Sequence, residues 1–549
     1  MKGPPGSPSP KEAHQEGRGV LRAGALVSGL TLVSRLLGLA RDMLMAHFLG
    51  RGMAAGAFYL AWVLPNLFRR LFGEGALAAA FIPRFQKEWD REGPERAREL
   101  LSQVSGSLLV LLFLLVVAGL SFLWLLPADW LASLFTRSAG NPLEYAAAFR
   151  RLATWLFPYL LPVCFLGLLA GALQARGHFA LPALAPVVLN LFWIASLLLG
   201  GVAWGYRGER LGAFLALGVL AGGAAQVLLQ VPALKKKGLL VLPRPGWSSP
   251  GVKDVARNMA PALVGLAVFQ VNTLLDQVMA ATLVPEVGGN AVLFYANRLF
   301  QFPLALLGTS LAVASLPAFA RKAGQGKLEE LSSLFGLSAG TVLFLALPAA
   351  LGLALLAFPL LRVLFVHPGG RFTLSDAGET ARVLAFLAGG LPFVCLAQLA
   401  TRVHYAMGDY RSPVRIGAVL VGVNLALNLL LVGPMGVAGL ALATAATSFL
   451  LAFALLGRFS RLGVPSPWRE ILPPLARLLP LTLLMGALVL LLRSGTEGWG
   501  PGAALAVGLL GGGGAYLLPA ALLGFPEWRR LSGSWRKDGA GPPGRGRED

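Results

Sequence analysis

Apolar runs about 20 residues long recur along the whole chain, and this feature constrains the fold most. Hydrophobic residues make up 56% of the 549 residues and charged residues only 13%, whereas a soluble domain carries about 25% charged residues. A large soluble enzyme and a disordered chain are therefore excluded. Because a helix satisfies its own backbone hydrogen bonds in lipid, the pattern predicts an all-α polytopic membrane protein.

The runs predict about fourteen membrane-spanning helices. The second and eighth contain Pro or Gly and are expected to be broken helices. The predicted spans are 24–49, 54–82, 103–127, 150–174, 181–203, 211–233, 256–284, 290–320, 332–360, 381–405, 412–432, 437–457, 471–492 and 501–525.

The charge distribution predicts the orientation of these spans. The net charge is +21, and most of the 47 Lys and Arg residues fall in alternate loops and in the two tails. Since positive charge collects on the cytoplasmic side, both termini are predicted to be cytoplasmic. Residues 1–22 are expected to form a disordered tail, 234–254 a cytoplasmic linker and 527–549 a basic tail. With no nucleic-acid motif beside the charge, no nucleic-acid partner is expected.

Catalytic signatures are missing from the sequence. There is no Walker A, GxSxG or HExxH motif, and the five histidines are scattered. The two cysteines, Cys164 and Cys395, lie in apolar runs, which argues against a disulfide framework or a Cys-rich metal site. The protein is therefore not expected to be an enzyme, and any transport must draw on a gradient, the membrane potential or product consumption.

An internal repeat relates the two halves of the chain. Asp42 matches Asp276 at an offset of 234, and the motif A-x-G-x-[FY]-x-x-P occurs at residues 175–182 and 406–413. Six spans separate the copies, so the halves share one orientation, as in transporters built from parallel repeats. We expect six-helix lobes at 23–233 and 255–460, with 461–526 adding two helices outside the repeat.

Five arginines fall inside predicted spans and carry the chemistry of the sequence. An arginine at the centre of a membrane helix costs about 2.5–3.5 kcal/mol, so each needs either an interface to snorkel to or a water-filled cavity. Carboxylates in the same segments do not match these arginines in number. An anionic group on a substrate is the simplest partner for the unmatched cations. The planar guanidinium suits phosphate. The five are Arg35, Arg41, Arg69, Arg70 and Arg298.

Four segments resemble the MurJ/MviN lipid II flippases of the MOP exporter superfamily. The resemblance covers roughly residues 24–460, and the first two segments are specific to the family in this order and spacing. The segments are SRLLGLARD (34–42), LPNLFRRLFGEGALAAAFIP (64–83), FYANRLFQFP (294–303) and ALQARGHFALPALAPVVLN (172–190).

The resemblance implies transfer of lipid II, a polyprenyl diphosphate carrying a disaccharide-pentapeptide, to the outer leaflet of the bacterial inner membrane by alternating access. The family's cationic residues fall on the five arginines, and its acidic partners fall on Asp42 and Glu74. The additional helices at 461–526 are expected to form a groove for the lipid tail, and a monomer is expected to suffice. One departure is Gly56, where many members carry an acidic residue.

Some members of the family resemble cation-coupled transporters, which suggests a sodium ion as a possible cofactor. The candidate oxygen ligands here are Asp276, Asn424, Asn428 and Thr444. Asn424 and Asn428 are four residues apart and share a helical face. Asn428 stands where an Asp can occur in the family, and the alternative role for these residues is interhelical hydrogen bonding.

Two other functions remain open from the sequence. An exporter of another polyprenyl-linked oligosaccharide would use the same arginines, whereas a drug exporter would need acidic residues in the cavity. An enzyme that processes polyprenyl phosphates would need a cluster of Asp, His or Lys at a membrane face, which the sequence does not contain.

Overall fold

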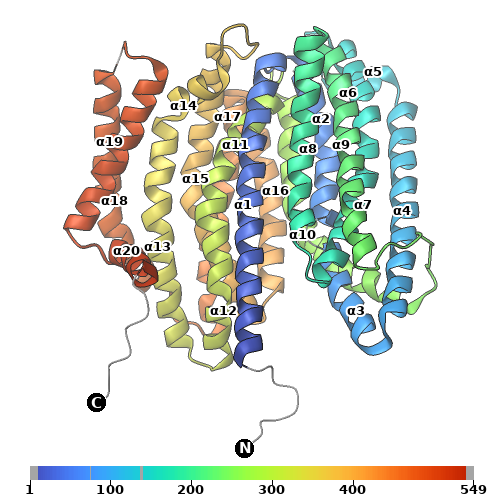
Figure 1. Ribbon diagram of the computed structural model, residues 1–549. Helices are drawn as coiled ribbons and strands as arrows, with labels where there is room; N and C mark the ends of the chain where they lie inside the picture. Colours follow the sequence, from blue (N-terminus) through green and yellow to red (C-terminus); the bar gives the residue numbers. More distant parts are fainter. Residues whose placement is uncertain (1–9, 74–75, 136–139, 497, 540–549) are drawn as a thin grey trace, which may run out of the picture. The chain divides into compact units, whose positions relative to one another are not determined.

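The computed structural model describes residues 10–73, 76–135, 140–496 and 498–539. Within these ranges every regular element is a helix (Figure 1). The chain divides into two compact units. Unit 1 comprises Met1–Ala291 and Gly369–Phe372, and unit 2 comprises Val292–Pro368 and Thr373–Asp549.

Unit 1 is built from long helices joined by short turns. Two of these turns carry a helix-starting signal: Asn141 caps one helix, and Ser249 followed by Pro250 starts another. The elements are α1 (Pro10–Leu49), α2 (Met53–Phe68), η1 (Arg69–Gly73), α3 (Ala76–Glu92), α4 (Pro94–Leu125), α5 (Ala128–Ser133), α6 (Pro142–Leu156), η2 (Phe157–Tyr159), α7 (Leu160–Ala175), α8 (Ala180–Leu198), η3 (Leu199–Ala203), α9 (Gly208–Lys236) and α10 (Pro250–Thr282).

The core of unit 1 is aromatic. Helix α8 packs against α1 and α9, and α2 packs against α6. The Trp193 ring of α8 meets Phe58 and Trp62 of α2 edge-on, with centroids 5.5 and 5.0 Å apart. Edge-to-face pairs of this kind are favourable beyond their buried area. They fix α8 against α2 beside the polar residues of α1.

Unit 2 contains the remaining elements. Helix α11 (Gly289–Pro303) crosses the boundary, because unit 1 ends at Ala291. The others are η4 (Leu304–Thr309), α12 (Ser310–Gly324), α13 (Leu328–Leu355), α14 (Ala357–Phe365), α15 (Leu374–Ala406), α16 (Arg411–Met435), α17 (Val437–Gly457), η5 (Phe459–Leu462), α18 (Trp468–Gly495), α19 (Pro501–Leu522) and α20 (Pro526–Gly539).

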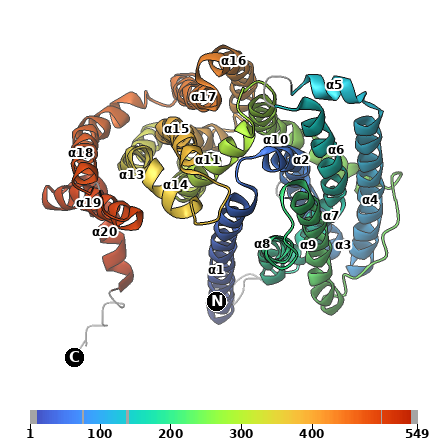
Figure 2. The same cartoon turned by 90° about the horizontal axis from the view of Figure 1, so that it is seen from above.

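Helix α15 is the central helix of unit 2 and packs against α12, α13, α14 and α17 (Figure 2). A capping box between Thr373 and Asp376 starts it. The two helices outside the repeat join this unit, since α18 packs on α13 and α19 packs on α18 and α14. The additional helices are therefore integral to unit 2.

Eleven helical segments among the described residues are long and apolar enough to cross a membrane. The prediction of an all-helical membrane fold is confirmed. Helices α1, α2 and α10 coincide with the first, second and seventh predicted spans but are not among the eleven. The count of fourteen stays a prediction.

Both predicted interruptions appear as π-helical segments, and the eighth predicted span continues through its segment as one helix, Gly289–Gly324. Between α2 and α3, η1 is a π-helical segment that precedes the residues left undescribed at 74–75, and η4 is a second π-helical segment directly after Pro303. A proline removes one backbone donor and clashes with the preceding turn. In each half the interruption falls in the span that carries arginine, at Arg69 and Arg70 and near Arg298.

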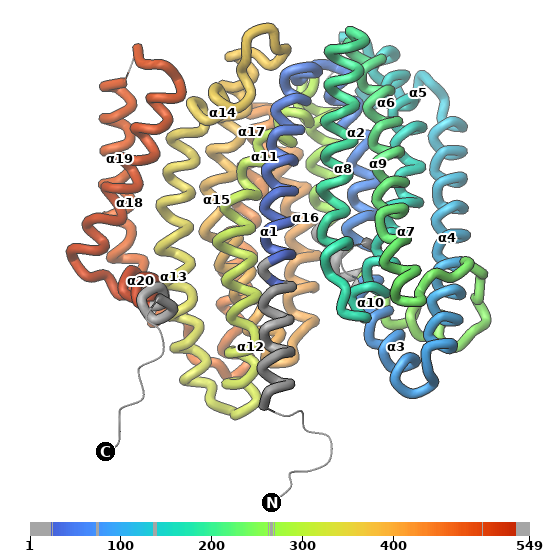
Figure 3. The backbone as a smooth tube through the Cα atoms, viewed as in Figure 1, coloured from blue at the N-terminus to red at the C-terminus, as the bar shows by residue number. Residues whose placement is uncertain are grey.

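Two boundaries differ from the sequence-based expectations. Helix α1 begins at Pro10, inside the expected tail, since residues 11–16 favour helix. Helix α10 clusters with unit 1 because it packs against α2, α3 and α4. The linker also follows α4: Arg244 N donates to Ser102 O at 3.0 Å. Figure 3 traces α3, α4 and this linker along one side of unit 1.

Candidate functional site: a buried charged cluster in unit 1

The strongest polar cluster in unit 1 is built around Arg41 and Asp42 of α1. Arg41 Nε and Nη2 both donate to Asp42 Oδ1, at 3.0 and 2.7 Å. Arg41 is 9% exposed and Asp42 is 1% exposed. Desolvating two charges is expensive, and their attraction offsets that cost only with good geometry and further hydrogen bonds.

Helix α8 supplies those further contacts. Asn190 Oδ1 accepts from Arg41 Nη1 at 3.3 Å, and Asn190 Nδ2 donates to Ser34 O at 3.0 Å. The Arg41 guanidinium lies over the Trp193 ring, 4.4 Å from its centroid, a cation–π contact. The arrangement holds the cation in one orientation and ties α1 to α8. We call Arg41, Asp42, Asn190 and Trp193 the charged cluster.

The sequence analysis missed Asn190 and Trp193, and it counted Arg41 among cations without matching carboxylates. For Arg41 that count is wrong, because Asp42 is its close partner. The two side chains are adjacent along α1, so helical periodicity places them in different directions, yet the long guanidinium reaches back. The signal that could have found Asn190 is its polar amide inside an otherwise apolar span.

The other cations of unit 1 are more accessible than Arg41. Arg35 is exposed on α1, and Arg69 and Arg70 are half-buried in η1. Arg69 Nε and Nη2 donate to Asn66 Oδ1 at 3.2 and 3.0 Å, which directs that guanidinium along α2. Glu74, the second predicted acidic partner, lies outside the described residues.

Arg298 belongs to unit 2. It is half-buried on α11, five residues before Pro303 and the π-helical segment. The structure therefore assembles Arg41 with Asp42 within unit 1 and places Arg298 on a separate unit. The convergence of the five arginines on one cavity stays a prediction.

The candidate sodium ligands of unit 2 form a neutral chain. Asn428 Nδ2 donates to Asn424 Oδ1 at 2.9 Å, and Asn424 Nδ2 donates to Thr447 Oγ1 at 3.3 Å. Both asparagines are buried, and Thr444 O accepts from Thr447 Oγ1 at 3.1 Å. Thr447, which the sequence analysis did not select, completes this chain. Asp276 lies on α10 in unit 1.

The residues packed around Gly56 explain why glycine occupies this position. Asn290 Nδ2 donates to Gly56 O at 2.8 Å. A Cβ atom at Gly56 would lie 2.8 Å from Tyr145 Oη and 3.1 Å from Asn290 Oδ1, closer than real Cβ contacts allow. An acidic residue therefore does not fit here without movement of its neighbours. Asn290 itself is fully buried.

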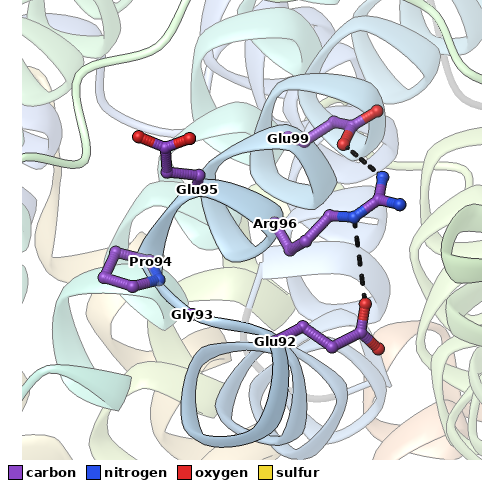
Figure 4. Close-up of a pocket in the computed structure, with 6 residues that line it drawn as sticks. All are labelled: Glu92, Gly93, Pro94, Glu95, Arg96 and Glu99. Atoms are coloured by element: carbon purple, nitrogen blue, oxygen red, sulfur yellow. Dashed lines mark hydrogen bonds and ion pairs between the residues drawn. The ribbon is translucent and has the colours of Figure 1, made fainter.

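The pocket between α3 and α4 does not suit an anionic substrate (Figure 4). Glu92, Glu95 and Glu99 line it, and Arg96 Nη1 contacts Glu99 Oε2 at 2.7 Å. These groups are exposed, so their ion pairs are screened by water. Among the described residues no group of three or more His, Cys, Asp and Glu side chains is placed to hold a metal ion.

The helical fold with eleven candidate membrane spans among the described residues defines a multi-pass membrane protein. The sequence profile of the family "Lipid II flippase MurJ" matches residues 45–510. The chain therefore belongs to the MurJ family, whose members are transporters rather than enzymes.

Relatives and solved structures agree with this assignment. A Vibrio cholerae protein named "Probable lipid II flippase MurJ" is 36% identical over 440 residues, which cover 78% of this chain and 81% of that protein. A Burkholderia cenocepacia protein named "Lipid II flippase MurJ" is 33% identical, with 82% and 86% covered.

Two solved structures show the same fold. "Lipid II flippase MurJ, inward closed conformation" superposes with a TM-score of 0.74 at 22% identity, covering 92% of this chain and all of that one. A multidrug resistance MATE family transporter of the MOP superfamily, in an inward-facing conformation, has a TM-score of 0.64 at 16% identity, with 80% and 98% covered.

Proposed function

We propose that this protein transfers lipid II from the inner to the outer leaflet of the bacterial inner membrane by alternating access. Membership of the MurJ family supports the substrate. The single structural observation that carries the proposal is the charged cluster, a nearly dry arginine–carboxylate pair held by α8. A buried ion pair is weak evidence for stability, so its burial within the first predicted span favours a role in transport.

The arginines divide into two roles in this proposal. Arg41 is committed to Asp42, Asn190 and Trp193 and acts as a positioning residue between α1 and α8. The more accessible Arg35, Arg69, Arg70 and Arg298 then contact the diphosphate. Each charge-assisted hydrogen bond contributes roughly 1.5–3 kcal/mol.

The polyprenyl tail is assigned to the lipid-facing side of residues 461–526. This proposal is supported by rows of exposed leucines on α18 and α19, among them Leu483, Leu491 and Leu510. Their inner faces pack closely instead: a Cβ at Gly486 would lie 2.6 Å from Leu351 Cδ2. Charged substitutions at the exposed leucines should reduce transfer of long-chain lipid more than of a short-chain analogue. Equal loss for both would favour a purely structural role.

Sodium binding also remains a proposal. Buried amide and hydroxyl oxygens of α16 and α17 favour it, since sodium prefers oxygen ligands. The same groups already bond to one another, and the only carboxylate of the proposed set, Asp276, lies on α10. Thermal unfolding of the wild type in sodium and in potassium, compared with Asn428→Ala, tests this. Sodium-specific stabilisation that Asn428→Ala removes would support the site, and identical curves would exclude it.

In the proposed topology, both termini and the 234–254 linker lie in the cytoplasm. The proposed working unit is a monomer. Ser248 is exposed in this linker and suits a labelling site. A thiol introduced by Ser248→Cys should resist a membrane-impermeant reagent added to intact cells. Efficient labelling from outside would reverse the orientation.

Genetic rescue tests the function. The chain should restore growth of a bacterium depleted of its own lipid II flippase. An exporter of another polyprenyl-diphosphate-linked oligosaccharide, the alternative, would leave growth unrestored while reaching the membrane at the same level. The inside-negative membrane potential favours outward transfer of the diphosphate, because each negative charge that moves outward releases about 2.3 kcal/mol per 100 mV.

A further inference from the structure

A further helix, α20, follows the last predicted span. At the end of α19 the backbone of Gly524 is left-handed, with φ at 65°, and Phe525 N donates to Ala520 O at 3.0 Å. This is a Schellman turn, for which glycine is the favoured residue. Pro526 then starts α20, which lies across the ends of α18 and α19 (Figure 1).

The buried side chain of Glu527 anchors the first turn of α20 against α18 and α13. Glu527 is 1% exposed, and its Oε1 lies 3.5 Å from Arg477 Nη2 of α18. A Cβ at Gly340 of α13 would lie 3.4 Å from the same oxygen, so α13 and α20 approach closely here. Arg530 Nη1 donates to Leu337 O at 3.4 Å. The helix is therefore held at a defined position on unit 2.

The outer side of this anchored turn combines cations with exposed apolar side chains. Arg529 and Arg530 are exposed, Arg530 while also bonded to Leu337 O, and Leu522 and Leu523, just before the turn, are 85% and 73% exposed. The acidic residue of the turn is buried, so its outward charge is positive. We call Leu522, Leu523, Arg529 and Arg530 the α19–α20 corner.

We propose that the α19–α20 corner binds the headgroup of an anionic phospholipid. The two guanidinium groups suit a phosphodiester, because arginine presents paired donors to phosphate oxygens. The leucines are continuous with the exposed Leu518 of α19, along which acyl chains would lie. A free phosphate or a soluble acidic partner would gain nothing from this apolar surface, so charge complementarity together with the leucines selects a membrane lipid.

The physical setting is that of an interfacial helix. Basic segments directly after a membrane span are attracted to anionic lipids, and each cation near the surface strengthens binding about fivefold. An apolar flank beside the cations places such a helix at the boundary between headgroups and acyl chains. The lipid would hold α20, and through Glu527 and Arg477 the additional helix α18, against α13.

The test uses the full-length protein in neutral detergent, titrated with phosphatidylglycerol, with the midpoint of thermal unfolding as the readout. The wild type should be stabilised by phosphatidylglycerol and not by phosphatidylcholine or inorganic phosphate. R529A/R530A should need roughly thirtyfold more phosphatidylglycerol for half of the stabilisation, since two cations are lost. R529K/R530K should keep only part of the response, since the charge stays but the paired donors are lost, and added salt should weaken the response.

A matched control removes two exposed lysines at the end of α9. K235A/K236A lowers the net charge equally but leaves the α19–α20 corner intact, so it should raise the phosphatidylglycerol requirement much less than R529A/R530A does. If R529A/R530A is unstable without lipid, the single variant Arg529→Ala should still need about fivefold more phosphatidylglycerol. An unchanged response in Arg529→Ala, an equal loss in K235A/K236A, or the same stabilisation by inorganic phosphate would overturn the proposal.

Discussion

The two units bury polar groups at corresponding places but with different chemistry. In unit 1, Asn190 of α8 supports the charged pair of Arg41 and Asp42. In unit 2, Asn424 of α16 bonds to the neutral side chains of Asn428 and Thr447. Helix α16 is the fifth span of the second half, as α8 is of the first. A neutral network ties membrane helices together at low cost. That unit 1 keeps a charged pair instead points to a transport role.

Removing one charge from the charged cluster should give the largest difference in stability between substitutions in unit 1 and in unit 2. Arg41→Ala leaves the Asp42 carboxylate buried without its cation and should lower the free energy of unfolding by about 3–5 kcal/mol. Thermal and denaturant unfolding in detergent measure this. The double variant R41A/D42N should recover much of the loss, because neither charge then remains buried. A loss in Arg41→Ala no larger than in Asn424→Ala would remove the distinction between the clusters.

The two asparagines provide a matched pair of substitutions. Asn190→Ala deprives a guanidinium of an acceptor and should cost roughly 1.5–3 kcal/mol. Asn424→Ala breaks only neutral hydrogen bonds, which in membrane proteins average about 0.6 kcal/mol. The same unfolding measurements rank the two. Equal costs would mean that Asn190 contributes no more than an ordinary interhelical contact.

The two copies of the repeated motif differ at a titratable position, which is Asp409 in the second half, and stability measured against pH should show the difference. Burial opposes ionisation of Asp409, but hydrogen bonds from Ser412 and His404 outweigh it and lower the pKa of Asp409 to about 2. The pKa of an Asp carboxyl in the unfolded protein is about 3.9. Because the pKa is lower in the folded protein, the ionised Asp409 stabilises the fold at pH values above about 3.9. This stability, on the order of 2 kcal/mol, is lost as the pH falls through about 2.

Asp409→Asn should therefore flatten the acid side of the stability profile. At the offset of the motif, the first half carries His178 instead of a carboxylate. Unfolding midpoints from pH 7 downward check the prediction, with the exposed Glu95→Gln as a control that should follow the wild type. A parallel loss in wild type and Asp409→Asn would show that Asp409 does not stabilise this loop.

The sequence predicted the local features of this molecule well and its long-range contacts poorly. The breaks at Pro303 and around Arg69 and Arg70 follow from residue types alone, as does the shared face of Asn424 and Asn428. The contact of Arg41 with Asn190 does not, because it joins residues 149 apart. Helix–helix packing decides which polar groups meet, and the apolar pattern of a membrane span does not encode its neighbours.

Arg298→Ala should have only a small effect on stability. Its side chain is half-buried on α11, and we expect a change of about 0.5–1 kcal/mol in the free energy of unfolding. Transport should nevertheless fall sharply, since the proposal places this guanidinium on the diphosphate. This contrast with Arg41→Ala separates a substrate-contacting arginine from a positioning one.

The most direct test measures lipid II at the outer face of cells depleted of their own flippase. Cleavage of lipid II by an enzyme added from outside reports how much has crossed the membrane. The wild-type chain should restore this cleavage, and Arg298→Ala, folded and present at the same level, should not. Absence of restoration by the wild type, or equal restoration by Arg298→Ala, would contradict lipid II transfer through an arginine-bound diphosphate.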